Sequence, residues 1–191
     1  MMKQYIYCDS CREETLHELV REEKNLYRCT KCGTYTTYVP EKEIELRAVI
    51  STGARSVRGK IKVRESDFIE KGDEYIVDTN EGHKIGEVTS LEMKNGSRAE
   101  TGEARDVATV WLRDVGEVEV RFSLHKRSVT SPYKMLVDGE TEFEIGEVIN
   151  IDGKNFRIHR IKLLEGGVLK RPGSRARARD IRRVYAKYES R

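Results

Sequence analysis

The chain has 191 residues, of which 37% are hydrophobic and 36% charged, and its formal net charge is +3. This length permits one domain or two to three small ones, and the composition is typical of a water-facing protein. The longest apolar stretches are a few residues, far below the roughly twenty that cross a bilayer, so we expect no membrane span and no membrane partner.

The small net charge conceals an uneven distribution along the chain. Residues 1–40 hold six basic and six acidic side chains, and residues 41–165 sum to −4. Residues 166–191 carry nine basic and two acidic side chains, a surplus of +7. The carboxyl-terminal end is therefore the cationic end of the chain.

All four cysteines fall near the amino terminus as two CxxC pairs. Cys8 and Cys11 form the first pair, Cys29 and Cys32 form the second, and seventeen residues separate them. Each CxxC turn presents two sulfurs to one ion, and two turns supply the closed tetrahedral shell that Zn²⁺ favours in structural sites. The segment between the pairs has the alternation and polar turn of a small hairpin. We therefore predict a zinc ribbon over residues 1–40 with one structural Zn²⁺ as its cofactor.

Three other uses of four cysteines are weighed against zinc. A pair of disulfides suits a small secreted domain, but the start of the chain has no apolar run long enough for a signal peptide. A thioredoxin-like redox pair opens a helix after a strand, whereas both CxxC pairs here are flanked by hairpin-like sequence. An iron–sulfur centre also takes four thiolates and is compatible with the spacing. A closed shell leaves no position to activate water, so the metal is expected to fold the module rather than to catalyse.

From residue 43 onward the chain repeats itself without a gap, so that Glu43 aligns with Glu117. At this offset the block Ala104–Val107 (ARDV) falls on Ala178–Ile181 (ARDI), and the sequence EIELR that starts repeat 1 falls on EVEVR. Twelve identical pairs exceed the roughly four or five that chance matching of about 6% gives, and they cluster in blocks. We predict two copies of one unit, repeat 1 over 43–116 and repeat 2 over 117–190.

Both copies consist of short strand-like segments, with no convincing amphipathic helix. Charged and apolar residues alternate, or apolar runs lie between a Gly and a polar turn. The expected strands are 43–48, 57–63, 74–77, 85–93 and 107–112 in repeat 1, and 117–122, 147–151, 156–164 and 181–186 in repeat 2. The sequence therefore predicts a mostly β chain, in which two tandem small antiparallel β-barrels of SH3-like or OB-like type follow the ribbon.

The last of these segments has a second interpretation. Ile181, Val184, Tyr185 and Tyr188 have helical spacing, which in isolation predicts a carboxyl-terminal helix. The corresponding segment of repeat 1, 107–111, is β-branched and aromatic, so a strand is favoured in both copies.

A row of cations in repeat 1 is the strongest candidate for a nucleic-acid contact. Its members occupy alternate positions of one expected strand, so that they share one face, and they are Arg58, Lys60, Lys62 and Arg64. Positive charges about 6.6 Å apart suit a phosphate backbone. Glu43 and Glu45 on the neighbouring strand offer the alternative of a cross-strand ion-pair ladder.

A denser basic stretch lies near the carboxyl terminus, where Pro172–Ser174 is typical of an exposed loop. The residues predicted to contact phosphates there are Lys170, Arg171, Arg175 and Arg177, with further arginines at 179, 182 and 183. Solvated charge near a terminus is the alternative. Five of the nine tyrosines lie in the ribbon, where they either stack on unpaired bases or cover the metal, and they are Tyr5, Tyr7, Tyr27, Tyr35 and Tyr38.

Motifs that carry catalytic chemistry do not occur in the sequence. The histidines, His17, His83, His125 and His159, are scattered, and none recurs in both copies. No nucleophile elbow, phosphate-cradling glycine loop or HExxH motif is present. We expect that the protein is not an enzyme and identify no small-molecule substrate.

The order of these parts resembles an uncharacterised archaeal zinc-finger protein family. That family has a CPxCG-type ribbon with a His a few residues after the first knuckle, here His17, and a β-rich region that ends in an Ala-x-Asp-Ile-x-Arg-x-Tyr-like block, here Ala178–Tyr185. The first knuckle carries Asp9-Ser10 where the family usually has Pro, while Cys32-Gly33 matches. The resemblance implies an archaeal origin, a cytoplasmic location and a zinc ion, and it implies no activity.

The functional prediction is a non-enzymatic zinc-binding protein whose partner is structured RNA or a ribonucleoprotein of the translation machinery. The alternative is a protein-interaction adaptor of the transcription or translation apparatus, without direct nucleic-acid contact. The two differ in salt dependence, because phosphate contacts weaken steeply with salt whereas an apolar protein interface does not.

Overall fold

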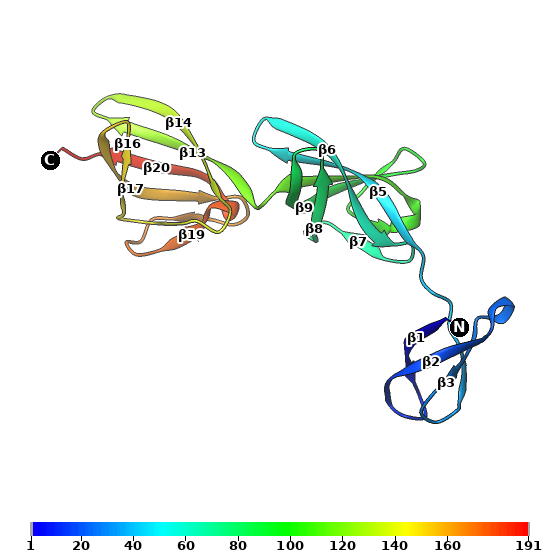
Figure 1. Cartoon of the computed structure of the whole chain (residues 1–191). Helices are drawn as coiled ribbons and strands as arrows, with labels where there is room; N and C mark the ends of the chain where they lie inside the picture. The colour runs from blue at the N-terminus through cyan, green and yellow to red at the C-terminus, as the bar shows by residue number, and fades with distance from the viewer. Residues whose placement is uncertain (1, 191) are drawn as a thin grey trace. The chain divides into compact units, whose positions relative to one another are not determined.

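The computed structural model describes residues 2–190 and divides into two compact units (Figure 1). The first, the ribbon unit, extends to Lys42, and the second, the barrel unit, begins at Glu43. Between residues 2 and 190 the elements are strands and three single 3-10 turns, without an α-helix. The described part of the chain has no helix long and apolar enough to cross a membrane. The prediction of a mostly β chain is confirmed.

The ribbon unit is one antiparallel sheet in the order β1-β2-β3-β4. The 3-10 turn Glu22–Lys24 connects β2 to β3. Besides cysteines, the buried side chains of the ribbon unit are Ile6, Thr15, His17 and Tyr27. These are too few to stabilise a domain without a metal or another cross-link. The strands are Lys3–Cys8 (β1), Glu13–Arg21 (β2), Leu26–Cys29 (β3) and Tyr35–Thr37 (β4).

In repeat 1 five strands close into a barrel in the order β5-β6-β8-β9-β12. The pairs between neighbours are antiparallel except one, because β12 closes the ring by lying parallel to β5. β10 extends the sheet beyond β9, and β7 and β11 form a separate two-stranded ladder. The strands are Glu43–Thr52 (β5), Arg55–Arg64 (β6), Phe68–Glu70 (β7), Glu74–Thr79 (β8), Gly82–Met93 (β9), Arg98–Ala99 (β10), Thr101–Glu103 (β11) and Val107–Asp114 (β12).

Repeat 2 has the same order of strands in an open form, β14-β13-β20-β17-β16. Its first and last long strands are again parallel, but β14 and β16 do not pair with each other, so the sheet is a half-barrel. The strands are Glu117–Lys126 (β13), Val129–Asp138 (β14), Glu142–Glu144 (β15), Val148–Ile151 (β16), Lys154–Leu163 (β17), Val168–Leu169 (β18), Arg175–Arg177 (β19) and Ile181–Tyr188 (β20). The last segment is a strand, as predicted, and not a helix.

The internal duplication is confirmed by the element bounds. β5, β6, β7, β11 and β12 recur with the same lengths, and at the one offset that aligns Glu43 with Glu117, as β13, β14, β15, β19 and β20. The 3-10 turn Ala104–Asp106 recurs in the same way as Ala178–Asp180.

One strand departs from that constant offset. The Val88 carbonyl accepts the backbone N–H of Gly72, and the same bond in repeat 2 joins Ile158 to Gly146, so Val88 of β9 corresponds to Ile158 of β17. The gap-free alignment instead places Val88 on Lys162. That alignment is therefore wrong over this strand.

One position differs between the repeats at the place where the closed form pairs its last two strands. Gly59 of β6 pairs with Thr79 of β8, and a Cβ placed on Gly59 would lie 2.5 Å from the Asp78 carbonyl oxygen. The corresponding residue of repeat 2 is Tyr133, whose Cβ and ring cannot occupy that space. We infer that this side chain helps to keep β14 apart from β16.

Each repeat has its own hydrophobic core, built from corresponding positions. The two cores distribute volume differently. In repeat 1 Ala48 and Gly86 leave room for Leu112, and a Cβ on Gly86 would lie 2.9 Å from Leu112 Cβ. In repeat 2 the corresponding residues are Phe122, Phe156 and Ala186. Large and small residues have exchanged places at these three positions, and repeat 2 holds the larger total volume.

Polar contacts join the repeats within the barrel unit. Asp114, whose side chain is 1% exposed, accepts bonds from the backbone N–H of Glu117 at 2.9 Å, from the Thr52 hydroxyl at 2.7 Å and from Lys84 Nζ at 2.9 Å. Arg179 is ion-paired with Glu74 and lies 3.2 Å from Glu140. The short connection between the copies is thus held by the buried Asp114 carboxylate and by the ion pairs of Arg179.

Candidate metal centre and nucleic-acid interface

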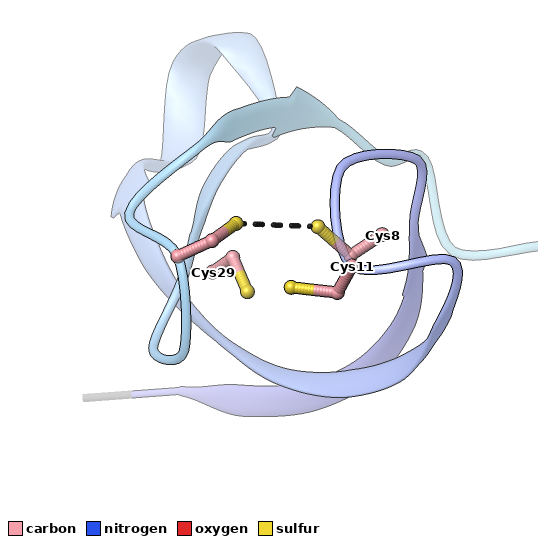
Figure 2. Close-up of side chains that lie close together, drawn as sticks. Cys8, Cys11 and Cys29 are labelled. Carbon is pink, nitrogen blue, oxygen red and sulfur yellow. Dashed lines mark hydrogen bonds between the residues drawn. The ribbon is translucent and has the colours of Figure 1, made fainter.

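The four cysteines converge on one point of the ribbon unit. Their Sγ atoms all lie within 4.8 Å of one another, and Cys8 Sγ is 3.5 Å from Cys32 Sγ. Figure 2 shows the labelled sulfurs turned toward a shared space between the two loops. The four cysteines are free thiols, and no disulfide joins them. The separation of 3.5 Å is also far longer than the S–S bond of about 2.05 Å.

The two knuckles have the same backbone geometry. In the first, the N–H of Arg12 donates to the Cys8 carbonyl at 2.7 Å, and in the second the N–H of Gly33 donates to the Cys29 carbonyl at 3.0 Å. Arg12 and Gly33 both have left-handed φ values, 57° and 76°. Glycine adopts this conformation at little cost, so Gly33 suits its position and Arg12 is held there by the knuckle.

The cysteine thiols differ in acidity because of their neighbours. Thr15 Oγ1 lies 3.2 Å from Cys29 Sγ, and this contact, together with hydrogen bonds from the backbone of Cys32 and Lys31, lowers the pKa of Cys29 to about 5. Thr34 Oγ1 lowers the pKa of Cys32 in the same way. Desolvation, followed by the neighbouring sulfurs, raises the pKa of Cys11 to about 12. Four sulfurs this close do not all lose their protons unless a cation takes the protons' place.

The sulfur positions fit a tetrahedral Zn²⁺ ion. A Zn–S distance of about 2.3 Å places neighbouring sulfurs roughly 3.8 Å apart, which agrees with the observed 3.5 Å and the 4.8 Å upper limit. Cys8, Cys11, Cys29 and Cys32 would hold the ion, and the Thr15 hydroxyl would support the Cys29 thiolate.

The structure also shows where His17 and the five tyrosines of the ribbon lie. His17 is fully buried, and its Nδ1 lies 2.9 Å from the Thr15 carbonyl oxygen, so it packs beneath the knuckles and is not part of the sulfur cluster. Among the tyrosines, Tyr27 is buried and packs edge-on against Tyr38, which serves the core. The other three are exposed and are Tyr5, Tyr7 and Tyr35.

The predicted basic row of repeat 1 lies on one exposed face of β6, which pairs with β5. Lys60 Nζ is 2.9 Å from Glu45 Oε2, so one rung of the alternative ion-pair ladder is present. Lys62 faces Glu45 in the register, and Arg64 faces Glu43. Arg58 and Lys60 also line an open cleft of about 880 Å³. The row is therefore exposed, and its charge is partly neutralised by Glu45.

The basic stretch near the carboxyl terminus divides into two parts. Lys170 and Arg171 are exposed beside Pro172. The two arginines of β19 are ion-paired across the β15–β19 ladder: Arg175 with Glu142 and Glu144, and Arg177 with Glu140 and Asp180. Arg179 belongs to the repeat junction described above. Much of the charge that made this segment conspicuous is therefore compensated locally.

The strongest uncompensated charge lies on β17 and β20, which pair with each other in repeat 2. These strands contain seven basic residues and no acidic one: Lys154, Arg157, Arg160, Lys162, Arg182, Arg183 and Lys187. Arg157 pairs with Glu189, and no ion pair of the other six is found within residues 2–190. Sequence reasoning included the two β20 arginines and missed the β17 members. Alternation of cations with apolar residues over 156–163 was the available signal.

We name the outward part of these strands, with His125 of β13, the β17–β20 face; its members are His125, His159, Arg160, Lys162, Arg183, Tyr185 and Lys187. The Arg160 guanidinium lies 3.7 Å from the Tyr185 ring centroid, and the His125 ring is nearly parallel to that of Tyr185, at 10° and 6.4 Å. Burial and then the charges of Lys187, His125 and Arg160 lower the pKa of His159. The face therefore has a positive potential and a planar, partly aromatic centre.

Comparison with known proteins agrees with the metal centre. A family model described as a CPxCG-related zinc finger matches residues 8–187. The chain is also similar to an uncharacterized protein of Methanocaldococcus jannaschii, with 27% identity over 190 residues that cover 96% of this chain and 88% of the relative. No solved structure matches the chain. The archaeal zinc-finger resemblance is thereby confirmed.

Proposed function

Because the chain belongs to the CPxCG-related zinc finger family, we propose that it is a non-enzymatic, zinc-stabilised protein that binds RNA. Four thiolates fill the shell of one structural ion and leave no position for a reacting water. The metal folds the ribbon, and the barrel unit supplies the binding surface. The partner envisaged is structured RNA or a ribonucleoprotein of the translation machinery.

The observation that carries this proposal is the β17–β20 face. Its cations stand on two paired strands without an acidic side chain among them. A surface built for stability alone would pair opposite charges across strands, as β15 and β19 do. Phosphates are the abundant anions that match such a row, and each one neutralised releases counterions into solution.

The predicted contacts of the other repeat support the same ligand. Arg58 and Lys62 extend outward from β6, and Lys170 and Arg171 stand in an exposed loop of repeat 2. Lys60 is ion-paired with Glu45, so its contribution to RNA affinity is expected to be smaller. We place these residues at the edge of the binding surface and the β17–β20 face at its centre.

The test is fluorescence anisotropy with labelled ribosomal RNA fragments at several salt concentrations. About four phosphate contacts predict a loss of roughly 50-fold in affinity between about 50 and 200 mM salt. Charge reversal by K162E together with K187E should weaken binding by more than tenfold. The matched control, K24E with K94E, changes two exposed lysines that do not belong to the face or to its strands and should alter affinity less than twofold.

A competing outcome has a distinct signature. If native protein co-purifies with a defined protein complex after nuclease treatment, and if both charge reversals leave RNA affinity unchanged, the adaptor function replaces this proposal. Affinity for that complex should then change little with salt.

A further inference from the structure

Both repeats carry the same aromatic–cation device at the same position. Trp111 of β12 and Tyr185 of β20 stand at the same place in corresponding strands of the duplication. The Arg98 guanidinium lies 4.9 Å from the Trp111 ring centroid, and that of Arg160 lies 3.7 Å from the Tyr185 centroid. The two arginines come from different strands, β10 and β17. Both repeats therefore place an arginine over the aromatic ring of the last strand, although the arginine comes from a different strand in each repeat.

The surroundings of each ring match a nucleotide. Trp111 lines the cleft of about 880 Å³, together with Val49, with the cations Arg47, Arg58 and Lys60, and with the acidic residues Glu45 and Glu92. Around Tyr185 the positive groups are those of the β17–β20 face. In each repeat a flat, polarisable surface thus stands beside several cations. A nucleotide consists of a flat base attached to a phosphate, and binding sites for single strands combine these two features.

Cross-strand stabilisation of the sheet is the alternative explanation for such pairs. Hydrogen bonding argues against stabilisation as their sole role. Five buried side-chain nitrogen or oxygen atoms in residues 2–190 lack a hydrogen-bond partner, and two of them belong to these pairs: Trp111 Nε1 and Arg160 Nε. Pairs that served the sheet alone would be expected to satisfy these donors. Cross-strand hydrogen bonding therefore does not explain why these side chains stand here.

We propose that the Trp111–Arg98 and Tyr185–Arg160 pairs are two base-stacking positions, so that the RNA segment bound by the barrel unit is unpaired. This inference rests on the proposed RNA-binding function and specifies its ligand. Bases in an A-form duplex are stacked on one another and cannot reach a side chain, whereas bases in loops and single strands stack on aromatic rings and guanidinium planes. Stacking tolerates any base, so the preference is for single-strandedness rather than for a sequence.

The experiment compares one short RNA, about twelve nucleotides long, in single-stranded form and annealed to its complement. Trp111 is the only tryptophan of the chain, so its fluorescence reports directly on the cleft of repeat 1. We expect saturable quenching by the single strand and at least tenfold weaker binding of the duplex. Y185A should lose about tenfold in single-strand affinity, while Y185F, which keeps the ring, should stay within about threefold of wild type.

Controls separate stacking from folding and from charge. R160Q retains the Tyr185 ring and removes the guanidinium, and it should weaken single-strand binding several-fold without changing the circular dichroism spectrum. F68A removes a 57% exposed aromatic ring of repeat 1 that lies outside both pairs, and it should have no effect on affinity.

Equal affinity for single strand and duplex would overturn the inference while leaving RNA binding intact, and so would wild-type affinity of a folded Y185A. Failure of every RNA to bind the wild-type protein would instead remove the proposed function itself.

Discussion

Repeat 1 and repeat 2 are two solutions of one duplicated unit, one closed and of mixed charge, the other open and strongly basic. The closed barrel has Gly59 where its last strand pair meets, and the open one has Tyr133. β9 and β12 carry two basic residues and three acidic ones, whereas the corresponding β17 and β20 carry seven basic and none acidic. The same unit can therefore form either a closed barrel of mixed charge or an open sheet with a basic outer surface.

The largest expected effect comes from removing the metal, which tests whether the two repeats fold independently of the ribbon unit. Chelation of the metal, or C29S, should unfold the ribbon unit, because structural zinc contributes about 10 to 16 kcal/mol in small zinc peptides at neutral pH. The barrel unit has its own two cores and should keep its melting temperature. Two-dimensional NMR with and without chelator measures both responses. The control S10A, which changes a non-ligand in the first knuckle, should retain the metal.

The exchange of core volumes leads to a second prediction. F122A removes a fully buried ring from repeat 2 and should cost about 3 to 5 kcal/mol in the free energy of unfolding. The reciprocal change in repeat 1, A48F, overpacks a core that already contains Leu112 and should cost about 1 to 3 kcal/mol. Urea unfolding measures both. L136A, at a position that is 56% exposed, is the control and should cost less than about 0.5 kcal/mol.

Closure of repeat 1 can be broken with the residue that repeat 2 uses. G59Y places a side chain against the Asp78 carbonyl and should separate β6 from β8, at a cost of about 1 to 3 kcal/mol. Hydrogen exchange should then increase at the β6–β8 pair and remain slow elsewhere in the barrel. Unchanged protection of the amides of Gly59 and Thr79 would contradict the explanation given for the open form.

The buried carboxylate at the junction between the repeats has a pH dependence of known sign. Burial alone would raise the pKa of Asp114, but the Glu117 N–H, Lys84 and Thr52 outweigh it and hold that pKa below its ordinary value. A lowered pKa in the folded state stabilises the protein above the ordinary pKa of about 3.9, and this stabilisation is lost as the pH falls. The stability difference between wild type and D114N should therefore be constant from pH 7 to about 5 and shrink below about pH 4. A difference that stays constant to about pH 2.5 would show that the charge is not responsible.

Several features of this molecule are readable in the sequence because they depend on residues close together in the chain. The CxxC pairs determine the sulfur cluster, and the internal repeat decides between strand and helix for the segment that ends at Tyr188. Other features depend on distant pairs. Arg175 is ion-paired with Glu144, which is far away in the sequence. The open form of repeat 2 depends on the distance between two strands that are not consecutive in the chain.

The β17–β20 face belongs to this second group. Arg160 and Tyr185 lie on different strands, and only the register of β17 against β20 brings them together. The gap-free alignment also concealed which residues of β9 and β17 correspond, because it shifted β17 relative to β9. With the observed correspondence, Lys162 occupies the place of Glu92, and each faces the equivalent residue of the last strand, Arg183 or Thr109.

The smallest expected effect transfers part of this face to repeat 1. E92K gives the closed barrel the charge that repeat 2 has at the same place, removing an acid and adding a cation beside the cleft of Trp111. One additional phosphate contact predicts a rise in RNA affinity of about threefold to tenfold at low salt and a slope of affinity against salt that is steeper by about 0.7 to 0.9. E92Q, which removes the charge without reversing it, should give roughly half of this effect on a logarithmic scale. If E92K raises affinity and leaves the salt slope unchanged, the lysine acts on the cleft and not on a phosphate, and the charge difference between the repeats would then have another cause.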